Sequence, residues 1–116
     1  MKNRPFIDRL GFAVEGIKMG FRQESSIRTQ VMFAAALLPM LIILRPSLVW
    51  WAIAGAMASA VIAAELFNTA LENVIDLVHP DYHAKVKLIK DCAAGGVLLL
   101  SIGALWVGFL MVLSVL

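Results

Sequence analysis

The sequence has 116 residues, of which 61% are hydrophobic and only 16% are charged. This apolar fraction exceeds the roughly 45–50% of soluble globular domains, and a short soluble chain needs more charge to cover its relatively large surface. The net charge of +2, with no basic patch interleaved with aromatic residues, argues against nucleic acid as a partner. The single cysteine, Cys92, excludes an intrachain disulfide and a cysteine-rich metal site. We therefore predict an all-α membrane protein with one domain over residues 1–116.

Charged and apolar residues are mixed throughout residues 1–28, a pattern typical of an amphipathic helix that lies in the membrane interface. We expect this helix over about residues 5–26, with its basic side chains toward the lipid headgroups. An ordinary soluble helix is the alternative, but the chain offers no soluble core for it to pack on. We expect no signal peptide, because an uninterrupted apolar stretch is missing before Glu24.

Three stretches without any charge follow, at residues 29–44, 46–64 and 92–116. A membrane-spanning helix needs about 20 residues, so the first stretch must borrow a turn from its polar flank. The prolines of Arg45-Pro46-Ser47 and His79-Pro80-Asp81 predict breaks between helices. We predict spans over about residues 27–45, 48–77 and 90–115.

The basic residues set the expected orientation, since lysine and arginine accumulate in cytoplasmic flanks. Six of them, from Lys2 to Arg28, lie in the N-terminal segment, and three lie in the connection between the second and third spans. The connection between the first and second spans has only Arg45. We therefore expect the N-terminus and the connection at 79–91 in the cytoplasm, and the C-terminus outside.

Small side chains recur at four-residue spacing along the second span, in two rows: Ala52, Ala56, Ala60 and Ala64, and Gly55, Ser59 and Ala63. In lipid, such rows let helix backbones approach closely. Because three helices from one chain make a thin bundle, these rows predict a homo-oligomer.

A stripe of polar residues continues from the second span. Glu65, Asn68, Glu72 and Asp76 follow at steps of three, four and four, which places them on one face of a helix. Glu65 comes directly after the uncharged stretch, and a carboxylate at that depth normally faces a protein interior and serves a function. A solvated helix end is the alternative, and it describes Asp76 better than Glu65.

Two further polar groups are expected at the same membrane level, namely Glu24 and the pair Lys90-Asp91. Carboxylates from two helices can hold Mg²⁺ together with phosphate oxygens and water. A lysine there would neutralise phosphate charge, and another carboxylate could deprotonate a lipid hydroxyl. These parts suffice for phosphoryl transfer, where catalysis is mostly positioning and charge stabilisation. The glycine-rich nucleotide loops of soluble kinases do not occur in the sequence.

At these residues the sequence resembles the bacterial integral-membrane diacylglycerol kinase family, which includes the undecaprenol kinases of Gram-positive bacteria. The resemblance covers about residues 11–100 and centres on ELFNTALENVID at 65–76, which matches the pattern E-x-x-N-[ST]-A-[IL]-E-x-x-x-D. Lys90-Asp91 and Glu24-x-x-x-Arg28 match on either side. The resemblance implies a homotrimer in the bacterial plasma (inner) membrane, with composite active sites between subunits. It also implies transfer of the γ-phosphoryl group of MgATP to the primary hydroxyl of a lipid.

The resemblance further implies a role for each matching residue. Glu65 would be the general base and, with Arg28, would contact the lipid substrate. Glu24 and Glu72 would hold the Mg²⁺ ion. Contacts to ATP would come from a larger set: Phe12, Glu24, Asn68, Glu72, Asp81, Tyr82, His83, Lys90 and Asp91. Phe12 stands where a well-known branch of the family has a tyrosine.

The acceptor lipid is left open between two types of the family. Ala93-Ala94-Gly95-Gly96 resembles the undecaprenol kinases, whereas Ser25-Ser26-Ile27-Arg28 lacks the Arg-Asn pair common in them. We expect diacylglycerol, with undecaprenol as the alternative.

A small multidrug or ion transporter is the rival from another functional class. Such proteins typically place a lone carboxylate in the middle of one of four spans. In this sequence three spans are expected, and the carboxylates gather at one membrane face. A purely structural membrane subunit would leave the stripe that begins at Glu65 unexplained.

Overall fold

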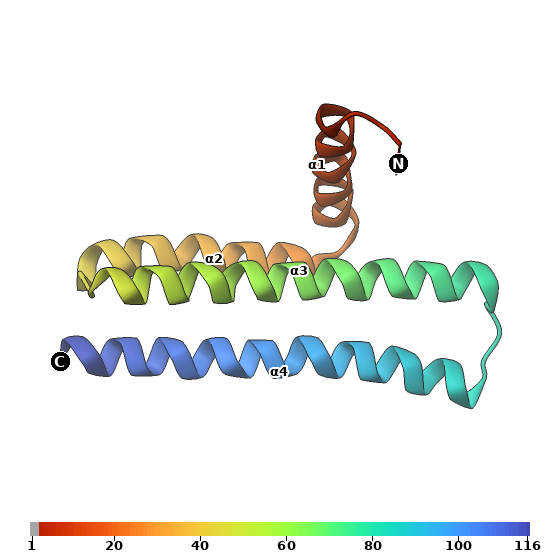
Figure 1. Ribbon diagram of the computed structural model, residues 1–116. Coiled ribbons are helices and arrows are strands. Elements are labelled where there is room, and N and C mark those ends of the chain that lie inside the picture. Colours follow the sequence, from red (N-terminus) through yellow and green to blue (C-terminus); the bar gives the residue numbers. More distant parts are fainter. Residues whose placement is uncertain (1–2) are drawn as a thin grey trace.

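The computed structural model describes residues 3–116 and consists of four α-helices joined by short connections (Figure 1). The helices are α1 (Phe6–Gln23), α2 (Ser25–Leu44), α3 (Leu48–Val78) and α4 (Ala84–Val115). The expectation of an all-α chain is confirmed. Lys2, which contributed to the predicted orientation, lies outside the described residues.

Three of the helices, α2, α3 and α4, are long and apolar enough to cross a membrane. Little of their surface is covered within a single chain: in α4 the one buried residue is Met111. An apolar surface of this extent requires lipid or other protein subunits around it. The chain is therefore a membrane protein with three spanning helices.

The three long helices run antiparallel to their neighbours in sequence, whereas α1 stands at a steep angle to them (Figure 1). Helix α3 contacts α2, α4 and α1. Near the C-terminal end of α4, all three long helices meet in a small core of Leu41, Ala54 and Met111.

The breaks expected at the two proline motifs are confirmed. Helix α2 ends at Leu44, and Arg45 adopts a left-handed conformation with φ 52°, a common way to end a helix. Helix α3 ends at Val78, immediately before His79-Pro80. Helix α4 begins at Ala84, earlier than the span expected from about residue 90, because the polar turns that precede the span are helical too.

The corner between α1 and α2 is tightly packed against α3. A Cβ atom on Gly20 would lie 2.8 Å from Leu66 Cδ2 and 3.1 Å from Ile27 Cδ1, so glycine permits this close approach. Ile27 is 1% exposed. Arg28 Nη1 donates to the backbone oxygens of Phe21, at 3.0 Å, and of Arg22, at 2.8 Å. These are carbonyls of the last turn of α1, which have no partner within the helix. The corner thus fixes the end of α1 beside Leu66.

Candidate active site

The polar stripe lies along α3, and its burial decreases toward the end of the helix. Glu65 is only 6% exposed. Asn68 and Glu72 are half-buried, and Asp76 is exposed. The stripe therefore leads from the interior of the membrane-spanning region to the solvated end of α3.

Glu65 is the one buried polar or charged residue within residues 3–116. Its carboxylate forms no hydrogen bond or ion pair with any of these residues. Covering most of a carboxylate without giving it a partner does not favour folding, so stability alone does not explain this residue. An unpaired acidic group at this depth is the strongest functional candidate in the chain.

Asn68 and Glu72 are held together one helical turn apart. Asn68 Nδ2 donates to Glu72 Oε1 at 2.7 Å, which fixes both side chains. Asn68 Oδ1 is buried without a partner among the described residues. A buried acceptor in this state costs about 1–3 kcal/mol, so this oxygen is available to a donor or a cation brought by a ligand.

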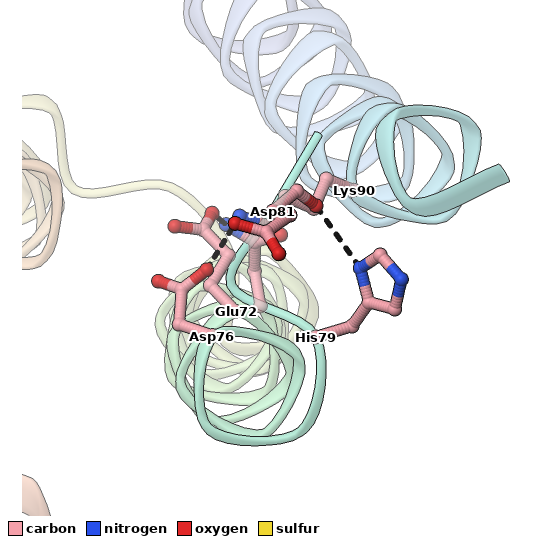
Figure 2. A network of polar contacts seen from close by, with 6 residues as sticks. Glu72, Asp76, His79, Asp81 and Lys90 are labelled. Carbon is pink, nitrogen blue, oxygen red and sulfur yellow. Dashed lines mark hydrogen bonds and ion pairs between the residues drawn. The ribbon is translucent and has the colours of Figure 1, made fainter. Parts of the chain in front are cut away.

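Lys90 and Asp91 are both engaged in ion pairs. Lys90 Nζ lies 2.7 Å from Asp76 Oδ1 and so joins α4 to the end of the stripe on α3 (Figure 2). Asp91 Oδ2 lies 2.6 Å from Lys87 Nζ, one turn earlier in α4. Lys87 was not expected at the site, although its i, i+4 spacing to Asp91 is a signal for this pair.

The connection between α3 and α4 is ordered by its two histidines. His79 Nδ1 donates to the backbone oxygen of Asp81 at 3.0 Å (Figure 2). His83 Nδ1 accepts from the backbone N–H of Lys85 at 3.0 Å and so caps α4. The two rings meet edge to face, with centroids 5.9 Å apart. Tyr82 is 80% exposed, which leaves its side chain free for a ligand.

The described chain brings some of the predicted site residues together and not others. Direct contacts join Asn68 to Glu72 and Lys90 to the stripe. Arg28 binds the end of α1 instead of a stripe residue. Glu24 is half-buried at the α1–α2 corner. Phe12 is 47% exposed and lies in the first half of α1, away from this corner. Within residues 3–116, no three His, Cys, Asp or Glu residues gather as metal ligands.

A cavity of about 640 Å³ lies between the three long helices, and no sequence pattern signals it. Its lining is almost entirely apolar and includes Phe33 and Leu37 of α2, Val61 of α3, and Ala104 and Met111 of α4. Val61 is one helical turn before Glu65. The cavity therefore lies within the spanning region, and its lining on α3 reaches Val61, one turn before Glu65.

Residues 11–112 of the chain match the family model described as prokaryotic diacylglycerol kinase. The chain is 36% identical over 98 residues to a diacylglycerol kinase of Synechocystis sp., covering 84% of this chain and 56% of that protein. It is 30% identical over 101 residues to an undecaprenol kinase of Bacillus subtilis, covering 87% and 82%. It is 26% identical over 106 residues to a diacylglycerol kinase of Haemophilus influenzae, covering 90% of each. The chain thus spans little more than half of the Synechocystis relative. No solved structure matches the chain significantly.

Proposed function

The chain belongs to the prokaryotic diacylglycerol kinase family, and we propose that it transfers the γ-phosphoryl group of ATP to the primary hydroxyl of diacylglycerol, giving phosphatidic acid. The observation that carries this proposal is the buried, unpartnered carboxylate of Glu65, followed along α3 by a stripe of polar groups. A lipid hydroxyl can reach such a group from the membrane while a nucleotide occupies the more solvated part of the stripe.

Glu65 acts as the general base. Its carboxylate takes the proton of the lipid hydroxyl as the hydroxyl oxygen forms a bond to the γ-phosphorus. The bond between that phosphorus and the bridging oxygen of ADP breaks, and ADP leaves with the electron pair. A carboxylate held without a competing partner is free to accept this proton.

Glu24 and Glu72 would hold Mg²⁺, which prefers oxygen ligands and usually combines one or two carboxylates with phosphate oxygens. Glu72 has an oxygen to offer such an ion, because Asn68 engages only one of its two carboxylate oxygens. The buried Asn68 Oδ1, which has no partner among residues 3–116, is a further oxygen at this level. When bound, Mg²⁺ neutralises phosphate charge and orients the triphosphate.

The remaining ATP contacts come from three regions. Lys90 contacts the phosphates, and Asp91 lies beside it at the start of the third span. The ordered connection contributes three side chains, those of Asp81, Tyr82 and His83. On α1, the exposed ring of Phe12 offers a flat surface for the base of ATP, since aromatic rings stack on nucleobases.

We place α1 in the cytoplasmic membrane interface of the bacterial plasma (inner) membrane, with the C-terminus outside. Two observations support this placement: α1 stands steeply to the spanning helices (Figure 1), and its large apolar side chains, such as Phe6 at 73% and Ile7 at 80%, are exposed. The apolar cavity, which is lined by Val61 one helical turn before Glu65, would accommodate part of an acyl chain.

We also propose a homotrimer with active sites shared between subunits. On α3, Ala52, Gly55, Ala56 and Ser59 are exposed in the single chain. A Cβ atom on Gly55 would meet nothing within 4 Å, so this face has no partner within the described residues. A row of small residues left open in lipid suits close contact with a helix of another subunit.

Phosphoryl transfer from radiolabelled ATP to lipid in mixed micelles tests the function. Separate reactions contain diacylglycerol, undecaprenol or no acceptor, and a Glu65→Gln variant serves as the inactive control. The proposal predicts labelled phosphatidic acid from diacylglycerol. Labelling of undecaprenol alone would support the second candidate, whose basis is the similarity to the Bacillus subtilis undecaprenol kinase. No labelled lipid in any reaction, with no ATP consumption that depends on added lipid, would refute the lipid kinase.

A further inference from the structure

We infer that Asp76 is a positioning residue for the phosphate-binding lysine, which it holds in place from the neighbouring helix. The inference rests on the proposed function, because it assumes that Lys90 contacts the phosphates of ATP. Asp76 has no assigned part in the metal, base or nucleotide contacts described above. Its part is to act through Lys90.

The geometry that points to this role is the ion pair between α3 and α4. Asp76 Oδ1 and Lys90 Nζ are 2.7 Å apart although the residues are separated by 14 positions (Figure 2). The Lys90 side chain is 35% exposed and that of Asp76 61%. An exposed pair of this kind adds little to folding stability because water screens it. The pair therefore calls for an explanation other than stability.

Two neighbouring carboxylates, one beside Lys90 in the sequence and one beside Asp76 on α3, have other hydrogen-bond partners. Asp91, its neighbour in the sequence, is paired with Lys87 at 2.6 Å. Glu72, one turn from Asp76 on α3, accepts from Asn68 at 2.7 Å. Among residues 3–116, Asp76 is thus the carboxylate that pairs with Lys90.

The chemistry of the ammonium group leaves room for a phosphate. A lysine has three N–H donors, so one bond to Asp76 leaves two for phosphate oxygens. An unpaired lysine has a flexible four-carbon stem, and ordering it on binding costs free energy. With the side chain already directed by Asp76, this cost is reduced before the nucleotide arrives. The ion pair with Asp76 therefore favours ATP binding and has little influence on the rate of the chemical step.

The test compares Asp76→Asn, Asp76→Glu, Lys90→Met and the double variant Asp76→Asn/Lys90→Met in the full-length protein. Asp76→Asn should raise the KM for ATP roughly three- to tenfold, the equivalent of one ordered side chain, with kcat nearly unchanged. Asp76→Glu, which retains the carboxylate, should restore most of the affinity. In the Lys90→Met background, Asp76→Asn should have no further effect on KM.

A KM for ATP in Asp76→Asn equal to that of the wild type would overturn the inference. An equal rise in KM with and without Lys90 would also overturn it, because Asp76 would then act independently of the lysine. Binding of a fluorescent ATP analogue in the absence of lipid repeats the comparison without turnover. If the wild type binds the analogue but phosphorylates no lipid, the proposed function is refuted. The effect of Asp76→Asn on analogue binding still tests the inference separately.

Discussion

The sharpest consequence of the site concerns Glu65→Gln, for which stability and activity should move differently. Glutamine has nearly the same shape as glutamate, so the packing around this residue, 6% exposed, is preserved. The change replaces an unpaired buried carboxylate by a neutral amide, which is less costly to bury. We expect the free energy of unfolding to stay equal or to rise by about 1–2 kcal/mol.

Turnover should nevertheless fall by about 10²–10⁴-fold, the usual contribution of a general base. This loss corresponds to roughly 3–5 kcal/mol in the activation barrier. The KM for ATP should change little, because the proposed role of Glu65 is at the lipid hydroxyl and not at the nucleotide.

The assay combines radiolabelled phosphoryl transfer with thermal unfolding in detergent micelles. Glu15→Gln is the matched control, since it makes the same chemical change at an exposed position of α1. Turnover of Glu65→Gln within a few-fold of the wild type would remove Glu65 from the mechanism. A fall in the free energy of unfolding large enough to explain the loss of turnover would show that the role of Glu65 is structural.

Three further predictions concern the metal, the corner and the topology. Glu24→Ala and Glu72→Ala should each raise the Mg²⁺ concentration needed for half-maximal activity, and unchanged Mg²⁺ titrations in both would place the metal elsewhere. Arg28→Leu removes two hydrogen bonds to the last turn of α1 and should lower the free energy of unfolding by about 1 kcal/mol. Limited proteolysis should then cut α1 faster, and an unchanged digestion rate would contradict this capping role. A membrane-impermeant thiol reagent added to intact cells, with any outer membrane opened, should modify a Ser47→Cys variant but not Cys92, and the reverse pattern would invert the topology.

The spanning helices could be predicted because their cause is local. Uncharged stretches predict the segments that can lie in lipid, and the prolines at positions 46 and 80 predict where the helices end. The first residue of α4 was harder to predict from the sequence, because the hydropathy pattern gives no signal in its polar first turns. There the helix is supported by the His83 cap and the Lys87–Asp91 pair, which depend on side-chain geometry.

The candidate site was predictable to the same extent. The stripe on α3 follows from helical spacing, and the burial of Glu65 could be expected from its place directly after an uncharged stretch. The contact between Asp76 and Lys90 was not accessible, because it requires knowing how the connection returns α4 along α3. The bonds from Arg28 to α1 likewise depend on the angle of the α1–α2 corner. Glu24 contacts no residue of the stripe within one chain, so its place in the active site remains a proposal.

The most direct test of the account follows the phosphorus itself. Purified protein is supplied with diacylglycerol and ATP whose terminal γ-oxygens carry ¹⁸O, and the lipid product is analysed by mass spectrometry. Direct attack by the lipid hydroxyl predicts phosphatidic acid that retains every labelled terminal oxygen and its own unlabelled hydroxyl oxygen. Label found only in free inorganic phosphate, with the diacylglycerol unchanged, would contradict the assignment of this membrane protein as a lipid kinase.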